Sequence, residues 1–399
     1  MLSVSEALLH IQHVAVSPET QTMLLKHALG FVVAEDIRAP INFPDVRQSA
    51  VDGYGFTIPL PRTPQQAHTF TLQGIIQAGS TQDVILKPQH SVRIFTGAKV
   101  PDAVNCIVMQ EYVMKESDER ITIPQEYLIE LANIRPIASQ CKQGDVLLRK
   151  GVMLTPGAMA LLASVGIHEM NVFKKPRVGI MATGKELIAL GNAILPGQVY
   201  ESNTLSLSAA LQQIHIPFTL FSTVDDNLES LSQQINVALQ QCDVLLITGG
   251  VSVGDYDFVL EACTKNKVEQ VFHKVKQRPG KPLYFGKKDS QFVFGLPGNP
   301  ASVLSCFYMF VYPMLMRMSG NTATGLTALQ LPLVEAVKKK AGLTFFLRGK
   351  LSEHGVQIPS GQESYKMTAF AEADCIISLE ENREAYQAGE FVKVYLLPS

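Results

Sequence analysis

The chain has 399 residues, 46% of them hydrophobic, which is enough to fill the cores of roughly two to four globular domains. Its 34 basic and 36 acidic residues leave a formal net charge of −2, so no long-range field draws it onto nucleic acid or an anionic membrane, and any anion site must be local. Six scattered cysteines without metal-site or redox-pair spacing, and an N-terminus without an export signal, favour a reduced, cytoplasmic protein.

The first 170 residues fall into three segments with different sequence patterns. Residues 1–40 are predicted to be helical, starting with a capping box at Ser3 and Glu6 and ending in an extended run to Pro40. Residues 41–134 are short β-branched runs broken by Gly and Pro, which predicts a small β-rich domain. Residues 135–170 then give an extended piece and a helix that begins at a Pro-Gly pair.

Residues 177–320 alternate between strand-like and helix-like segments, which predicts a parallel α/β sheet. The expected strands are 177–183, 217–224, 243–248 and 291–297, and the expected helices are 203–214, 227–241, 257–266 and the segment after 300. Within the last of these, the apolar run 303–316 is shorter than the ~20 residues that a bilayer requires, so it is predicted to be a buried helix. Residues 321–399 return to short strands and predict a second β-rich unit.

A glycine-rich stretch, "LLITGGVSVGDYDFV" at 245–259, follows the third expected strand. In open α/β sheets ligands bind at the carboxyl ends of the strands, and here glycines would let the backbone approach a phosphate near a helix that begins around Asp257. The alternative is a plain strand-to-helix turn that Asp257 caps. Two further loops, "TGKEL" and "LPGNPAS", follow other expected strands and favour a shared ligand-binding edge.

Three carboxylates are candidates for that edge. Asp226 and Glu229 stand three apart, as an N-cap and its partner do, so Asp226 can start the next helix and Asp225 is left over. Together with Glu186 and Asp257, Asp225 could supply oxygen ligands to Mg²⁺ or position phosphate-bound water.

A basic stretch, "VFHKVKQRPGKPL" at 271–283, supplies cations. If 271–278 is one extended strand, Phe272, Lys274, Lys276 and Arg278 point to one face, and Lys281 follows after a Pro-Gly turn. Such a row suits an oxyanion, although a solvated strand face would show the same charge pattern.

Six motifs in this order resemble the MoeA family of molybdenum cofactor biosynthesis enzymes, to which the E domain of gephyrin is equivalent. They are "SAVDGYGF" (49–56), "RIFTGAKVPDAVNCIVMQE" (93–111), "TGKEL" (183–187), "GGVSVGDYD" (249–257), "RPGKP" (278–282) and "LPGNPAS" (296–302). Each is weak alone, but six in order along nearly the whole chain are specific.

The resemblance implies an elongated, multidomain α/β protein. Its expected domains are a discontinuous first domain (1–40 and 135–170), a β-rich second domain (41–134), an α/β domain similar to molybdopterin adenylyltransferases of the MogA type (171–320) and a β-barrel-like fourth domain (321–399). It also implies a homodimer in which the active site lies where the third domain faces the other subunit.

The resemblance further implies a set of site residues. The expected catalytic group is Asp52, Thr96, Glu186, Asp225 and Asp257, with Mg²⁺ held by Glu186, Asp225 and Asp257. The expected substrate-binding group comes from the glycine loop, the basic stretch, the proline loop and the fourth domain, and comprises Gly249, Gly250, Ser252, Gly254, Lys274, Lys276, Arg278, Lys281, Pro297, Gly298, Asn299, Pro300, Arg348 and either Ser364 or Thr368.

Several of these positions have a plain structural interpretation as well. Asp52 is a good turn former and Thr96 a plausible strand end, while Pro300 suits the first turn of a helix. The chain also departs from the family pattern, with Gln140 where an acid is usual and Lys185 in place of another common acid.

The activity that the resemblance implies is that of a molybdopterin molybdenumtransferase, which converts adenylyl-molybdopterin and molybdate into molybdenum cofactor and AMP. A molybdopterin adenylyltransferase and molybdoenzymes would be its protein partners, with no nucleic acid and no membrane. Two alternatives are the preceding adenylyltransferase reaction, which the long flanking regions argue against, and a non-catalytic scaffold of the gephyrin kind, which the missing linker and adenylyltransferase domain argue against.

Overall fold

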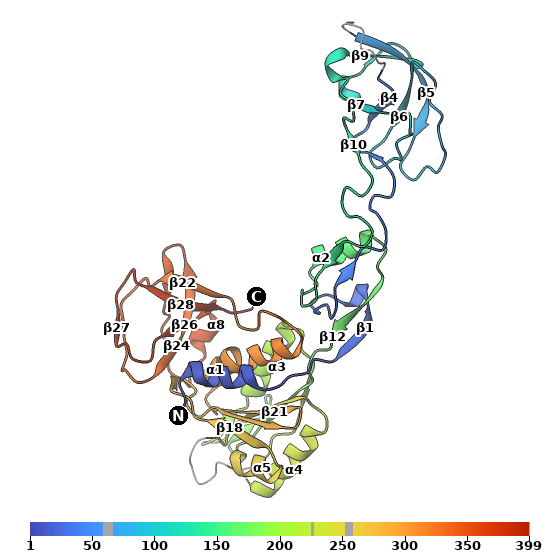
Figure 1. Ribbon diagram of the computed structural model, residues 1–399. Helices are drawn as coiled ribbons and strands as arrows, with labels where there is room; N and C mark the ends of the chain where they lie inside the picture. Colours follow the sequence, from blue (N-terminus) through green and yellow to red (C-terminus); the bar gives the residue numbers. More distant parts are fainter. Residues whose placement is uncertain (59–66, 225–226, 252–257, 399) are drawn as a thin grey trace.

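The protein consists of a body and a long arm (Figure 1). The structure is a computed structural model that describes residues 1–58, 67–224, 227–251 and 258–398. Residues 20–173 form the arm, which extends away from the body, and the remaining described residues form the body. The prediction of an elongated, multidomain α/β protein is therefore confirmed, whereas the four domain boundaries stay predictions.

The centre of the body is a six-stranded sheet in the order β16-β13-β17-β21-β20-β18. The first four strands are parallel and are those expected from the sequence: β16 (Phe218–Leu220), β13 (Val178–Ala182), β17 (Val244–Thr248) and β21 (Gln291–Leu296). The sheet is mixed rather than wholly parallel, because β20 (Tyr284–Lys288) reaches β21 through a tight turn, which only an antiparallel pair permits, and β18 (Glu269–His273) pairs antiparallel with β20.

Helices cover both faces of this sheet, because its side chains alternate between two cores. Ile180 and Leu246 face α1 (Val4–His13), α3 (Asn203–Gln213) and a long helix made of α6 (Pro300–Cys306), the π-helical η4 (Phe307–Val311) and α7 (Tyr312–Met318). Met181 and Leu245 face α4 (Leu228–Leu239) and α5 (Val259–Lys265). A short parallel pair, β14 (Leu187–Ile188) and β15 (Val199–Tyr200), lies beside the sheet.

Two predictions about helices have clear outcomes. The stretch Pro300–Met318 is long and apolar enough to cross a membrane, but 78% of its most apolar window is buried in the body, which confirms the expected buried helix. The Ser3 capping box is present, yet the helix ends at His13, so the prediction of a helical 1–40 is wrong. Residues after His13 turn to strand because β1 (Thr20–Leu24) pairs with β12 (Glu169–Phe173), a partner far along the chain.

The base of the arm is built from paired segments of its outgoing and returning chains. These pairs are β1 with β12, β2 (Ile37–Arg38) with β11 (Val146–Leu148), and β3 (Gln48–Ser49) with β10 (Ile134–Arg135), accompanied by η1 (Leu25–His27) and α2 (Pro156–Ser164). The helix α2 begins at the expected Pro-Gly pair, and Thr155 caps it.

The tip of the arm is a six-stranded sheet in the order β7-β4-β6-β5-β9-β8 around its own apolar core. Its elements are β4 (Gly53–Phe56), β5 (Ala67–Ile76), β6 (His90–Ile94), β7 (Cys106–Met109), η2 (Gln110–Tyr112), β8 (Met114–Lys115), β9 (Arg120–Pro124) and η3 (Gln125–Tyr127). Figure 1 shows this sheet at the end of the arm farthest from the body.

The C-terminal unit belongs to the body and is joined to it by a strand from the basic stretch. Its sheet has the order β19-β24-β26-β28-β22, in which β19 (Gln277–Arg278) pairs in parallel with β24 (Thr344–Ser352). The other elements are β22 (Ala328–Pro332), β23 (Val337–Lys338), β25 (Gly355–Gln357), α8 (Thr368–Ala371), β26 (Cys375–Leu379), β27 (Ala385–Tyr386) and β28 (Phe391–Leu396).

Candidate active site

Three loops converge at the carboxyl edge of the body's sheet. They follow β13, β17 and β21, which are adjacent in the sheet, and hydrogen bonds continue past the strand ends. The amide of Thr183 donates to the carbonyl of Thr248 at 2.9 Å, and the amide of Gly249 donates to the carbonyl of Leu296 at 3.1 Å. The structure therefore brings the "TGKEL", "GGV" and "LPGNP" segments together at one edge.

Gly249 is where the close approach of these loops requires a glycine. Its φ is +87°, and a Cβ placed there would lie 2.4 Å from the carbonyl oxygen of Thr183. A Cβ on Gly298 of the proline loop would lie 4.0 Å from the Cα of Gly249. At Gly249 and Gly298 the edge therefore presents tightly packed backbone, and Gly250 follows Gly249 in the chain.

The proline loop is held from two sides. Pro300 is the first residue of α6, as expected, and the amide group of Asn299 donates to the Ser364 hydroxyl at 2.9 Å. The amide of Ala301 donates to the carbonyl of Ser364 at 3.1 Å. From the other side, the Asn203 side chain donates to the carbonyl of Gly298 at 2.8 Å. The C-terminal unit therefore contacts the edge through Ser364.

Asn203 is a residue that the sequence analysis missed. It is the first residue of α3 and is buried, and its side-chain oxygen has no hydrogen-bond partner among the described residues. A start of a helix is an ordinary place for asparagine, so the sequence offers only a capping signal there. Its hydrogen bond to the proline loop joins residues that are far apart in the sequence, so it cannot be predicted from the sequence alone.

Arg348 of β24 is fully buried in the C-terminal unit. Its Nη2 donates to the carbonyl of Gly361 at 3.3 Å, while Nε and Nη1 have no partner among the described residues. Burial lowers the pKa of the guanidinium to about 10. The side chain of Gln362, a second residue that the sequence analysis missed, accepts from the backbone amide of Arg348 and holds the segment that leads to Ser364.

Ser364 and Thr368, the two candidates from the C-terminal unit, make different contacts. Ser364 contacts the proline loop, whereas Thr368 begins α8 and lies against Gly361, where a Cβ would approach its hydroxyl to 2.4 Å. Only Ser364 is therefore in direct contact with the carboxyl edge.

The basic stretch does not form the predicted single strand face. β18 ends at His273, and Lys274 adopts a φ of +69°, so the strand does not continue to Arg278; Phe272 is buried and Lys274 is half-buried. Lys276 is paired with Glu381 of the C-terminal unit at 3.0 Å. The prediction of one extended strand with these cations on a single face is therefore wrong.

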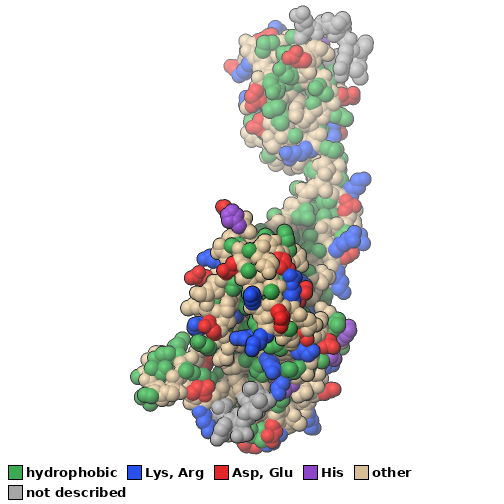
Figure 2. Space-filling view, turned by 90° about the vertical axis from the view of Figure 1, so that its left-hand side faces the viewer, with side chains coloured by type: hydrophobic (Ala, Val, Ile, Leu, Met, Phe, Trp, Pro, Cys, Tyr) green, Lys and Arg blue, Asp and Glu red, His purple; other side chains and the backbone are tan. Residues whose placement is uncertain are grey.

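Two cations of this stretch nevertheless stay exposed near α6. Arg278 lies over the Phe345 ring at 5.4 Å, and Lys281 follows the turn at Gly280. That turn packs on α6, since a Cβ on Gly280 would lie 2.4 Å from the Cys306 sulfur. Figure 2 shows several Lys and Arg side chains close together on the middle of the body, with Asp and Glu side chains among them.

The predicted metal ligands are only partly described. Glu186 is exposed just beyond β13, whereas Asp225 and Asp257, with Ser252 and Gly254, lie outside the described residues. Within the described ranges no three His, Cys, Asp or Glu side chains form a group that could hold a metal ion. The N-cap of α4 is Asn227, whose side chain accepts from the Ser230 amide at 2.8 Å, so the prediction of Asp226 as the cap is wrong.

Asp52 and Thr96 form a pair at the tip of the arm. The Asp52 carboxylate accepts hydrogen bonds from the Thr96 amide at 2.8 Å and from its hydroxyl at 2.7 Å. These two bonds lower the pKa of Asp52, and both residues are exposed. The structure does not bring this pair to the carboxyl edge within one chain, because the whole arm separates them (Figure 1).

Gln140 and Lys185, the two residues that depart from the family pattern, lie in different parts of the molecule. Gln140 is exposed at the base of the arm, where its side chain donates to the Ser164 hydroxyl at 3.1 Å, and Lys185 is exposed at the carboxyl edge beside Glu186. Only Lys185 therefore changes the charge of the edge itself.

Comparisons with known proteins cover almost the whole chain. Family models match residues 2–166 (MoeA N-terminal region, domains I and II), 179–317 (probable molybdopterin binding domain) and 330–397 (MoeA C-terminal region, domain IV). A molybdopterin molybdenumtransferase from Haemophilus influenzae is 35% identical over 387 residues, which are 94% of this chain and 93% of that protein. One from Staphylococcus aureus is 31% identical over 404 residues, covering 100% of this chain and 96% of that protein.

A solved structure agrees with these matches. The crystal structure of a molybdopterin biosynthesis MoeA protein from Pyrococcus horikosii superposes with a TM-score of 0.84 at 28% identity and covers 100% of both chains.

Proposed function

The chain belongs to the MoeA family, and on this premise we propose that it is a molybdopterin molybdenumtransferase, which inserts molybdate into adenylyl-molybdopterin and releases AMP. The observation that carries the proposal is the convergence of the β13, β17 and β21 loops with Ser364 at one edge of the sheet. This edge offers bare backbone for a nucleotide-linked phosphate and cations for an oxyanion, which are the two substrates of that reaction.

The glycine and proline loops would bind the adenylyl-molybdopterin. Gly249, Gly250 and Gly298 carry no side chains, so phosphate oxygens can approach their backbone closely. The bonds of Asn203 and Ser364 fix the proline loop, so the edge is ordered before the substrate arrives. These residues bind and orient, and none of them needs to form a covalent intermediate.

Cations next to α6 would bind molybdate, a dianion. Arg278 and Lys281 are exposed and can contact it directly, while the half-buried Lys274 adds a further charge. Arg348 is fully buried and contributes its charge from behind the segment that ends at Ser364. Because its Nε and Nη1 groups have no hydrogen-bond partner among the described residues, a nearby anion would stabilise the buried charge of Arg348.

Mg²⁺ is the metal that we expect at this edge. Glu186 is an exposed carboxylate, the oxygen donor that Mg²⁺ takes, and Mg²⁺ commonly uses only one or two carboxylates together with substrate phosphates. Asp225 and Asp257 would be the further donors. When bound, the ion would neutralise charge on the phosphates of the substrate.

A second copy of the chain would complete the site. Asp52 and Thr96 are far from the carboxyl edge of their own chain, so we propose a homodimer in which the arm of one copy reaches the edge of the other. Asp52 would then position the water that attacks the adenylyl phosphate, a role for which its lowered pKa keeps it ionised. We place the enzyme in the cytoplasm, where an adenylyltransferase would supply its substrate and molybdoenzymes would receive its product.

The test is an assay of the purified protein with adenylyl-molybdopterin, Mg²⁺ and molybdate. We expect AMP and molybdenum cofactor to form together and only when molybdate is present. AMP formation independent of molybdate, or no reaction at all, would contradict the proposal. Incubation with molybdopterin and ATP separates the adenylyltransferase alternative, for which adenylyl-molybdopterin would accumulate.

A further inference from the structure

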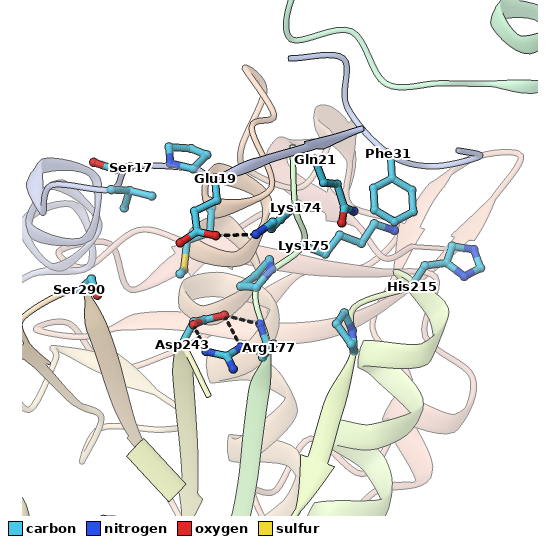
Figure 3. A pocket seen from close by; sticks show the side chains of 15 residues that line it. Ser17, Glu19, Gln21, Phe31, Lys174, Lys175, Arg177, His215, Asp243 and Ser290 are labelled. Carbon is cyan, nitrogen blue, oxygen red and sulfur yellow. Dashed lines mark hydrogen bonds and ion pairs between the residues drawn. The ribbon is translucent and has the colours of Figure 1, made fainter. Parts of the chain in front are cut away.

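A cavity of about 810 Å³ lies where the arm joins the body, at the amino edge of the sheet and opposite the candidate active site. Its walls are residues 16–19 and 174–177, which lead into and out of the arm, and the residues just before β16, β17 and β21 (Figure 3). The volume is that of a small-molecule site, for which about 300–1,000 Å³ is typical.

Most of the charge in this cavity is already neutralised. Lys174 pairs with Glu19 at 2.8 Å, and Arg177 pairs with Asp243 at 2.8 Å (Figure 3). The side chain of Lys175 lies apart from these pairs, next to Phe31, and makes no ion pair or hydrogen bond with any described residue (Figure 3). The cavity therefore has one cation whose charge is unbalanced.

The surroundings of Lys175 favour the binding of an anion to its ammonium group. Its Nζ lies 4.5 Å from the centre of the Phe31 ring, and the side chain is half-buried. Burial lowers the pKa of its ammonium to about 8, with no carboxylate nearby to offset the loss of water. A charge that has lost hydration without gaining an anionic partner interacts strongly with an incoming opposite charge.

We propose that this cavity is a binding site for a small organic anion that has one carboxylate or phosphate group on a flat apolar body. The anionic group would pair with Lys175, and the body would pack among Phe31, Pro176, Pro217 and Met318, which line the same cavity. One anionic headgroup matches the one unpaired cation. The site is separate from the proposed reaction and does not depend on it.

Because the cavity lies between the arm and the body, a ligand bound in it would affect how the two parts move. Phe31 belongs to the arm and Pro217 to the body, so a bound ligand contacts both parts. The chain crosses between the parts at residues 14–19 and 174–177, where the amide of Lys174 donates to the carbonyl of Glu19 at 2.8 Å. An occupant would therefore restrict the movement of the arm about this crossing.

The test uses the intact protein and isothermal titration calorimetry with four probes. We expect 2-naphthoate or 2-naphthyl phosphate to bind with about one site per chain, and 2-naphthamide and inorganic phosphate to bind at least about tenfold more weakly, because each lacks the headgroup charge or the apolar body. The tighter of the two anionic probes identifies the preferred headgroup. If neither binds, or if the neutral amide binds equally well, the proposal is wrong.

Three variants locate the site. Lys175→Met keeps the aliphatic stem and should weaken the anionic probe by about tenfold or more, whereas Lys175→Arg should retain it. Lys150→Met is the matched control, because Lys150 also lies over a phenylalanine ring, Phe173, but outside the cavity. Thermal unfolding checks that each variant is folded, and unchanged affinity in a folded Lys175→Met protein overturns the assignment.

The pH dependence gives a second readout. The other charged or titratable groups that face the cavity are Glu19, Lys174, Arg177, His215 and Asp243. Because the pKa of Lys175 is about 8, affinity should fall between pH 7 and pH 9.5 as this ammonium loses its proton. The fall should be absent in Lys175→Arg, and a fall that persists in that variant would assign the effect to another group.

Discussion

The carboxyl edge of the body and the tip of the arm carry the two halves of the proposed active site in different ways. At the edge, the site is built from backbone under close contact, as at Gly249, and from buried side chains such as Asn203 and Arg348. At the tip, it is one exposed pair, Asp52 and Thr96. Substitutions that disturb the packed backbone of the edge should therefore lower both stability and activity, whereas substitutions at the tip should affect activity alone.

The largest effect is expected for Gly249→Ala. The new Cβ would collide with the Thr183 carbonyl oxygen and force a strained φ, so we expect the free energy of unfolding of the body to fall by about 3 kcal/mol or more, with loss of turnover. Gly191→Ala is the matched control, because Gly191 has a φ of +89° but open space around it, and it should cost only about 1–2 kcal/mol. Equal losses in denaturant titrations would show that packing at the edge is unimportant.

Arg348→Met should separate activity from stability at the edge. Methionine removes a buried cation with two unpartnered donors, so we expect the free energy of unfolding to stay the same or rise by about 1 kcal/mol. Turnover should fall by about 100-fold to 1,000-fold, since a positive charge that we propose stabilises the reacting anions is lost. A destabilised variant would mean that Arg348 serves the fold, and Arg348→Lys should restore part of the turnover.

Asp52→Asn at the tip should reduce AMP release by about 100-fold, a usual value for the loss of a group that positions or activates water. Its unfolding transition should be unchanged, because Asp52 is exposed and its amide replacement can still accept from Thr96. A variant with normal turnover would remove the tip from the site.

Thr96→Val should give the smallest effect. The valine removes the hydroxyl that donates to Asp52 but leaves the backbone amide, so the pKa of Asp52 should rise towards its usual value. An Asp whose folded pKa is lowered keeps its charge until the pH falls through that pKa, so the acidic limb of the pH–rate profile should move to higher pH in the variant. A limb at the same pH would show that Asp52 does not control it.

Local patterns were sufficient to predict the frame of the body. The four parallel strands and the helices α3, α4 and α5 follow from runs of fixed periodicity, and the loops at Gly249 and Pro300 follow from residues with unusual backbone preferences. These features depend on residues that are close in the sequence, so they can be predicted from the sequence alone.

Contacts between distant segments could not be predicted in this way. β1 is a strand because β12 lies beside it, Val275 just after Lys274 bridges to Leu2 at the other end of the chain, and Asn203 donates to Gly298. The choice of Asn227 over Asp226 as a cap was also open, since both residue types cap helices equally well. The separation of Asp52 from the edge depends on the path of the arm, which motifs do not record.

The most direct measurement of the central claim is complementation between two inactive variants, Asp52→Asn and Arg348→Met, refolded together or co-expressed. If the arm of one copy completes the edge of the other, half of the dimers are mixed and each mixed dimer has one intact site, so AMP release should recover to about a quarter of the wild-type rate. If each arm served the edge of its own chain, every site would keep one lesion. Activity no higher than that of either variant alone would contradict the account.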